Sequence, residues 1–215
     1  MKRNNILFDL DGTLTDPKVG ITTAVSKALA YFGIQENPDN LTVFIGPPLV
    51  DSFMEYYGFT PEQAKQAVVK YREYFSVYGW AENEPYPGIY DFLQALCDAG
   101  KTLVVATSKP EEYAVRIMEH FDLAKYFSLI CGAPMDDPEA GRKAAVIKAA
   151  MQRANCRLED TIMVGDRRHD VEGAHQVGLP AVGVLYGYGG RTEHEACSAD
   201  FIAEDLDELL KILLS

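Results

Sequence analysis

Four aspartates in two short clusters have a spacing that could support catalysis. Asp9 and Asp11 lie in the segment Asp-Leu-Asp-Gly-Thr after one apolar run, and Asp166 and Asp170 lie in Gly-Asp-Arg-Arg-His-Asp after another. Residues two apart in an extended segment project to the same side, and Gly12 permits a sharp turn after the first pair. One aspartate of such a pair can attack phosphorus while the other donates a proton to the leaving oxygen. Carboxylates that share a site often have raised pKa values, which suits Asp11 as the acid.

A hydroxyl and a lysine follow a third apolar run, in the sequence Thr107-Ser108-Lys109. Active sites of open parallel sheets lie at the carboxyl ends of the strands, so we expect this segment and both aspartate clusters to meet at one sheet edge. Converging carboxylates repel one another unless a cation neutralises them. A carboxylate-rich, all-oxygen site suits Mg²⁺, which also takes a substrate phosphate oxygen. Thr107 is expected to contact phosphate, because Lys109-Pro110 then opens a helix whose N-terminus favours anions.

Short apolar runs must place these residues at the sheet edge. The expected strands are residues 6–8, 102–106, 127–130, 161–164, 181–185 and 201–202. Helical patterns separate them, at about residues 90–99, 111–121, 141–154, 171–177 and 206–214. Strands that are apolar at successive positions are covered on both faces. The alternation therefore predicts an α/β fold, a Rossmann-like parallel sheet with helices on both faces.

One long segment interrupts this alternation. Asp16-Pro17 favours a helix start, with Asp16 as N-cap and Pro17 at the first helical position, followed by an amphipathic helix over residues 19–32. A second helix is predicted from Thr60-Pro61 through residue 78. We therefore predict a core domain of residues 1–16 and 86–215, with residues 17–85 forming a small inserted helical cap.

The composition restricts the classes of partner. The chain has 215 residues, a formal net charge of −12 and a sequence pI near 4.7. An acidic surface disfavours nucleic-acid polymers and anionic membranes, so the expected partner is a small phosphorylated metabolite. Four scattered cysteines indicate reduced thiols, and no apolar run is long enough for a membrane span. The predicted location is the cytoplasm, and the predicted state is a monomer or weak homodimer.

These motifs, taken in order, resemble the haloacid-dehalogenase-like superfamily. Asp9-Leu10-Asp11-Gly12-Thr13-Leu14 resembles its first motif, Thr107 its second, and Gly165-Asp166 through Asp170 its acidic fourth. The third motif is a lysine early in a helix, for which Lys143 is the best match and Lys148 a competitor. The resemblance covers essentially the whole chain. Two segments look closest to phosphoglycolate-phosphatase-like and 5′-nucleotidase-like members: Phe44-Ile45-Gly46-Pro47-Pro48 and Val164-Gly165-Asp166-Arg167.

The resemblance implies a role for each matched residue. Asp9 forms an aspartyl-phosphate, and Asp11 acts as general acid and then as base for the hydrolytic water. Thr107 and Lys143 hold phosphate oxygens. Mg²⁺ is bound by Asp9, by the backbone carbonyl of Asp11, by Asp166, and by Asp170 directly or through water. Ser108 and Gly46 are further candidate substrate contacts. Gly46-Pro47-Pro48 reads equally as a loop that selects substrate or as a rigid turn between helices.

The expected activity is hydrolysis of a small phosphomonoester such as phosphoglycolate, a nucleoside monophosphate or a sugar phosphate. A dehalogenase of the same fold is disfavoured, because family dehalogenases lack the second aspartate, here Asp11, and need no metal. A phosphomutase would have to shield the aspartyl-phosphate from water. A phospho-accepting signalling receiver is shorter and carries its acceptor aspartate after the third strand, whereas Asp9 follows the first.

Overall fold

The computed structural model describes residues 3–135, 137 and 139–215. The chain divides into two compact units, one formed by residues 1–16 and 85–215 and the other by residues 17–84. Met1 and Lys2, which the predicted core range includes, lie outside the described residues. That the second unit acts as a cap stays a prediction.

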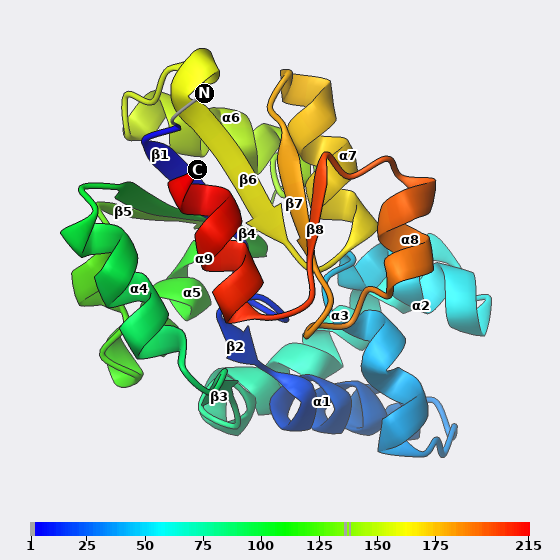
Figure 1. Ribbon diagram of the computed structural model, residues 1–215. Helices are drawn as coiled ribbons and strands as arrows, with labels where there is room; N and C mark the ends of the chain where they lie inside the picture. The colour runs from blue at the N-terminus through cyan, green and yellow to red at the C-terminus, as the bar shows by residue number, and fades with distance from the viewer. Residues whose placement is uncertain (1–2, 136, 138) are drawn as a thin grey trace. The chain divides into compact units, whose positions relative to one another are not determined.

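A parallel sheet of six strands forms the centre of the first unit (Figure 1). Its strands lie in the order β5-β4-β1-β6-β7-β8, and each neighbouring pair is parallel. Their bounds are β1 Asn5–Phe8, β4 Thr102–Pro110, β5 Leu129–Ala133, β6 Thr161–Gly165, β7 Ala181–Val184 and β8 Phe201–Ala203. The chain adds strands outward on one side of β1 and then returns to add β6 on the other side. The strand order therefore reverses between the carboxyl ends of β1 and β6, and sheets of this type bind ligands at such a switch point.

The strand register aligns the segments that carry the candidate residues. Phe8, the last residue of β1, lies opposite Val105 of β4 and Val164 of β6. Asp9 is thus one residue past that line, while Thr107 and Asp166 are two residues past it. The α/β fold and the convergence of the strand ends are as predicted.

Helices cover both faces of the sheet (Figure 1). On one face, α6 and α7 pack on a buried cluster that includes Leu7, Val104 and Met163 of the strands. On the other, Phe8 meets Phe92 of α4 and Phe127 edge to face. Alternate residues of β1 therefore supply the two cores. The helices are α4 Ile89–Asp98, α5 Glu111–His120, α6 Lys143–Arg153, α7 Arg168–Val177, α8 Arg191–Ala196 and α9 Leu206–Leu214, with short 3₁₀ turns η3 Ala124–Tyr126 and η4 Leu158–Asp160.

The second unit is helical. It contains α1 Lys18–Tyr31, η1 Pro38–Phe44, α2 Leu49–Tyr57, α3 Pro61–Tyr74 and the π-helical turn η2 Phe75–Gly79. The helix α3 starts where the Thr60-Pro61 sequence predicts, and Thr60 and Gln63 form a capping box there. Two-residue strands, β2 Thr15–Asp16 and β3 Glu84–Pro85, mark the places where the chain leaves and re-enters the first unit.

Some local predictions are wrong. Pro17, not Asp16, occupies the N-cap position of α1, and no side chain caps that helix. The Asp16 carboxylate accepts a hydrogen bond from the hydroxyl of Tyr188 instead. The strand predicted from Phe127 begins at Leu129, because Phe127 ends the preceding 3₁₀ turn. Nor does the sequence pattern predict α2 or α8 as separate helices.

Two predictions about the whole chain concern its cysteines and membrane spans. All four cysteines are free thiols, as their scattered positions indicate. Among the described residues, no helix combines the length and the apolar character that crossing a membrane requires.

Candidate active site

The loop after β1 fixes the first aspartate pair. The backbone N–H of Asp9 donates to the carbonyl of Val164 at 2.9 Å, which extends the pairing with β6 by one residue. The chain then turns at Gly12, where φ is +80°, in the left-handed region. A Cβ atom at Gly12 would lie 2.1 Å from Oδ2 of Asp166. This close approach allows the loops after β1 and β6 to meet, and it requires glycine.

The second aspartate pair lies at the end of β6 and the start of α7. Asp166 is fully buried, and its Oδ2 accepts the backbone N–H of Tyr188 at 2.8 Å. Asp170 is 1% exposed, and its Oδ2 accepts the backbone N–H of Arg167 at 3.0 Å. Carboxylate oxygens of Asp9, Asp166 and Asp170, one from each, all lie within 4.8 Å of one another. Residues 157 positions apart, Asp9 and Asp166, thus share one site.

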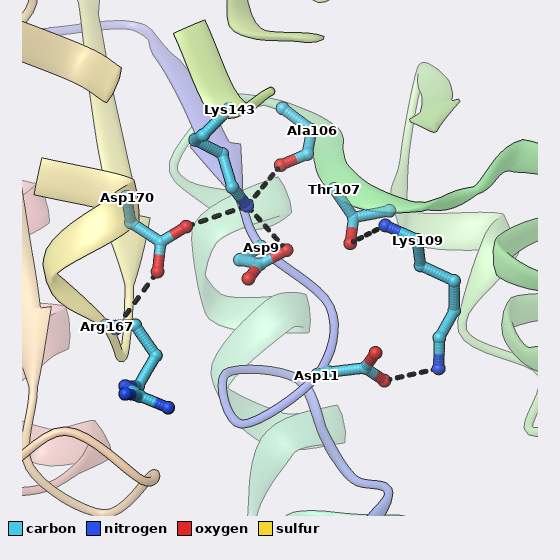
Figure 2. Close-up of polar contacts among 8 residues, drawn as sticks. All are labelled: Asp9, Asp11, Ala106, Thr107, Lys109, Lys143, Arg167 and Asp170. Atoms are coloured by element: carbon cyan, nitrogen blue, oxygen red, sulfur yellow. Dashed lines mark hydrogen bonds and ion pairs between the residues drawn. The ribbon is translucent and has the colours of Figure 1, made fainter. Parts of the chain in front are cut away.

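Lys143 provides the positive charge beside this cluster (Figure 2). It is the first residue of α6, and its Nζ lies 2.8 Å from Oδ1 of Asp9 and 2.7 Å from Oδ1 of Asp170. Nζ also donates to the carbonyl of Ala106 at 3.2 Å. Lys148, the competing candidate in the same helix, is exposed. A lysine in the first turn of a helix opposes the helix dipole. Here two buried carboxylates compensate for that placement.

A second lysine pairs with Asp11. Nζ of Lys109 lies 2.7 Å from Oδ1 of Asp11, and both side chains are almost fully buried. Lys109 follows Thr107 in β4, where the pairing with β5 shifts register between residues 106 and 110. Oγ1 of Thr107 accepts the backbone N–H of Lys109 at 3.3 Å. Ser108 lies between these two buried residues and is more exposed than either.

Burial and charge shift the pKa values of these groups. Burial raises the pKa of Asp166 well above its ordinary value, and the charges of Asp170 and Asp9 raise it further. Burial likewise raises the pKa of Asp170 to about 6, with Lys143 opposing the shift and Asp9 adding to it. Burial also raises the pKa of Asp11, against the opposing effect of its lysine partner. For Lys143, burial disfavours the charged form, but Asp170 and Asp9 outweigh it and the pKa is raised.

The residues present fit a divalent cation. Within the described residues, Oδ1 of Asp166 is a buried carboxylate oxygen with no hydrogen-bond partner. Three carboxylates and the single ammonium of Lys143 leave an excess of negative charge in the cluster when all are ionised. An all-oxygen donor set with excess negative charge suits Mg²⁺. Of the four predicted metal-binding residues, the structure brings together the carboxylates of Asp9, Asp166 and Asp170, whereas the carboxylate of Asp11 is paired with Lys109.

The remaining predicted contact, Gly46, belongs to the second unit. It lies between η1 and α2 with φ at +100°, a conformation that favours glycine. This placement agrees with the reading of Gly46-Pro47-Pro48 as a turn between helices. A contact between Gly46 and substrate stays a prediction.

Sequence reasoning missed the contribution of the segment after β7. Cβ atoms at Gly187 and Gly189 would lie 2.4 Å from Cβ of Asp166 and 2.0 Å from its carbonyl oxygen, respectively. The loop therefore packs directly on Asp166, and its Tyr188 N–H holds one carboxylate oxygen. The signal in the sequence was the run Gly-Tyr-Gly-Gly, whose glycines allow this approach. From the sequence alone, a flexible turn is favoured over a phosphate-binding loop for this run.

Comparison with known proteins identifies the family of this chain. A solved structure of a predicted phosphatase from Clostridium acetobutylicum superposes with a TM-score of 0.97 at 46% identity, covering 100% of this chain and 99% of that one. A 5′-nucleotidase of Pseudomonas aeruginosa is 44% identical over 213 residues, 98% of this chain and 96% of that protein. Tyrosine-protein kinase PtkA of Mycobacterium tuberculosis is 38% identical over 211 residues, 97% of this chain and 72% of that protein. A family model described as haloacid dehalogenase-like hydrolase matches residues 6–184. The chain is a hydrolase that belongs to the haloacid dehalogenase-like family.

Proposed function

We propose that this hydrolase is a magnesium-dependent phosphomonoesterase that acts through an aspartyl-phosphate on Asp9. The observation that carries the proposal is the buried cluster of Asp9, Asp166 and Asp170 with Lys143 at the switch point of the sheet. A dianionic phosphate needs positive charge to enter a carboxylate-rich site. A cation on the carboxylates and the ammonium of Lys143 together supply that charge.

The two aspartates of the first loop have different chemical roles. An oxygen of Asp9 attacks phosphorus, so that a P–O bond to Asp9 forms while the P–O bond to the leaving group breaks. Asp11 gives its proton to the leaving oxygen. It then takes a proton from the water that attacks the aspartyl-phosphate, which releases phosphate and restores Asp9. The raised pKa of Asp11, caused by burial, suits the protonated form that the first step needs.

The other residues of the site bind Mg²⁺ or phosphate and orient the nucleophile. Asp9, Asp166 and Asp170 would hold Mg²⁺. When bound, the ion supplies charge that draws phosphate oxygens toward the nucleophile. Lys143 holds one oxygen of Asp9 and offsets negative charge that develops on the phosphoryl group. Thr107, at the end of β4, is the proposed hydroxyl contact to phosphate.

Similarity to a 5′-nucleotidase makes nucleoside 5′-monophosphates the first substrates to test. Phosphoglycolate and sugar phosphates are the next classes in the panel. We further propose that the unit of residues 17–84 acts as the cap and that its Gly46 loop and Ser108 of the core contribute to substrate selection. The cytoplasmic location and the monomeric or weakly dimeric state belong to the same proposal.

Transfer of the phosphoryl group to an acceptor other than water is a second candidate function. The observation in its favour is the 38% identity to PtkA, which is named a tyrosine-protein kinase. Release of inorganic phosphate in multiple turnovers supports the hydrolase. Phosphotyrosine formed from ATP on a protein acceptor, without release of free phosphate, would favour the transferase.

The test is phosphate release from a panel of phosphomonoesters, with Mg²⁺ or with EDTA, by the wild type and by Asp9→Asn. Exposed Asp98→Asn is the matched control, because it removes the same charge at a surface position of α4. We expect turnover that requires Mg²⁺, survives in the control and is lost in Asp9→Asn. Equal turnover by Asp9→Asn, or no release from any ester, would contradict the assignment of Asp9 as nucleophile.

A further inference from the structure

The end of β4 presents two side chains to the site. The register shift between residues 106 and 110 interrupts the pairing of β4 with β5 at this point. Thr107 is 2% exposed and Lys109 is 9% exposed, while Ser108 between them is more accessible. The hydrogen bond from the Lys109 N–H to Oγ1 of Thr107 fixes the backbone of the bulge. The bulge therefore delivers an ammonium group as well as a hydroxyl.

Lys143 and Lys109 contact different aspartates of the site (Figure 2). Lys143 contacts Asp9 and Asp170, whereas Lys109 contacts Asp11. The side chains of the Lys109–Asp11 pair are 5% and 9% exposed. A charge-assisted contact at 2.7 Å in so little water fixes the orientation of both groups.

The backbone around Asp11 is fixed independently of this contact. The N–H groups of Leu14 and Thr15 both donate to the carbonyl of Leu10, at 2.9 and 3.1 Å, and the Gly12 N–H donates to the carbonyl of Thr15 at 2.8 Å. The torsions of the Asp11 side chain are therefore the freedom that remains. Contact with Lys109 removes that freedom, because Oδ1 of Asp11 accepts a hydrogen bond from the ammonium.

We propose that Lys109 is a positioning residue that holds Asp11 for proton transfer to the leaving group. This inference rests on the proposed phosphomonoesterase activity. Because the ammonium donates to Oδ1, the transferred proton is carried by Oδ2. As the P–O bond to the leaving group breaks, that proton moves from Oδ2 to the leaving oxygen, and Asp11 becomes a carboxylate whose charge Lys109 balances. Removal of Lys109 would leave the acid present but not oriented.

The dependence of kcat/KM on the leaving group distinguishes positioning of the proton donor from simple phosphate binding. An alkyl phosphate expels a strongly basic alkoxide and needs a proton, whereas p-nitrophenyl phosphate expels a stable phenolate and needs little help. The ratio kcat/KM reports steps only up to release of the leaving group. Comparing kcat/KM for both esters therefore isolates proton donation. A group that merely binds phosphate, or supports the fold, affects both esters alike.

The experiment uses the wild type, Lys109→Met, Asp11→Asn and the double variant, with p-nitrophenyl phosphate and the best alkyl phosphate of the panel. Lys148→Met is the matched control, since Lys148 is an exposed lysine away from these contacts. For Lys109→Met we expect a loss of about 10²-fold in kcat/KM on the alkyl ester and less than tenfold on the aryl ester. The double variant should lose no more than Asp11→Asn alone, because both changes remove one function.

Each alternative result has a distinct meaning. Equal losses of Lys109→Met on both esters, where Asp11→Asn shows unequal losses, would overturn the positioning role. Additive losses in the double variant would also overturn it. Lys109→Met leaves the buried carboxylate of Asp11 without its partner, which can destabilise the fold, so thermal unfolding of each variant is measured. The double variant removes both charges. If Lys109→Met does not fold, the double variant is compared with Asp11→Asn instead. Absence of turnover by the wild type would instead refute the proposed function itself.

Discussion

Replacing Asp166 by asparagine should make the metal-free protein more stable while abolishing its response to Mg²⁺. Asp166 is fully buried, and its Oδ1 has no hydrogen-bond partner among the described residues. An amide NH₂ at that place could donate to the carboxylates of Asp9 and Asp170. The other oxygen would still accept the N–H of Tyr188, which now holds Oδ2 at 2.8 Å. The substitution therefore removes a repulsion without leaving a buried donor unpaired.

The size of the effect follows from the separation of the charges. Two carboxylate oxygens up to 4.8 Å apart repel by at least about 3.5 kcal/mol at an effective dielectric constant near 20. Asp166 has two such neighbours, but the substitution also removes the attraction between Asp166 and the charge of Arg167, and burial, which raises the pKa of Asp166, already opposes its charged form. We expect a net stabilisation of about 1–3 kcal/mol. For a chain of 215 residues this corresponds to a rise in Tm of about 3–10 °C.

Magnesium should stabilise the wild type and have little effect on Asp166→Asn. A ligand present at about 100 times its Kd stabilises the folded state by about 2.7 kcal/mol, or roughly 5–10 °C here. The wild type should show this rise, and Asp166→Asn should show little of it. Thermal unfolding at pH 7 in EDTA and in Mg²⁺ measures both effects, with Asp98→Asn as the control for net charge. A lower Tm of Asp166→Asn in EDTA, or an undiminished rise with Mg²⁺, would refute the reasoning.

Three further substitutions test other parts of the site and fold. Lys143→Met leaves buried carboxylates without their ammonium, so we expect a loss of about 3–5 kcal/mol in EDTA by thermal unfolding, and loss of phosphate release, with Lys148→Met unaffected. Gly12→Ala places a Cβ atom 2.1 Å from a buried carboxylate oxygen at φ +80°, so it should lower Tm and turnover. By contrast, Gly100→Ala, at φ +74° with open space, should show backbone strain alone, and equal effects would contradict the steric argument. Glu111, whose pKa is lowered by its hydrogen bond to an arginine, contributes stability above its ordinary pKa of 4.5 and loses it as pH falls through the lower folded value. Because the pair is more than a third exposed, Glu111→Gln should cost under about 1 kcal/mol at pH 7 in urea unfolding, and the difference from wild type should shrink in acid.

Strand ends are the part of this site that can be read directly from the sequence. Apolar runs mark β1, β4 and β6, and parallel strands of one sheet end on the same side. Asp9, Thr107 and Asp166 follow those runs, so their approach in space follows from the fold class. The glycine after Asp11 is likewise readable, because an Asp-Gly sequence at a strand end indicates a turn.

Other features depend on distances that no local pattern encodes. Lys143 and Lys148 lie in the same helix, and which of them reaches Asp9 depends on where α6 begins, since five residues rotate a side chain to another face. The Asp16 carboxylate could cap a helix by its sequence, but Tyr188 from the loop after β7 competes for it. Such choices between local and distant partners are made by packing.

The sequence by itself determined much of the chemistry available at the sheet edge, because residue type and the apolar runs suffice to gather four carboxylates, the hydroxyl of Thr107 and one lysine, Lys109, there. Tertiary structure alone decided which lysine serves which aspartate and how the loop after β7 supports Asp166. The physical reason is the separation along the chain of the residues that interact. Strand and helix patterns arise from interactions between near neighbours, whereas the Lys109–Asp11 pair joins residues 98 positions apart, and that pairing forms when the sheet is assembled.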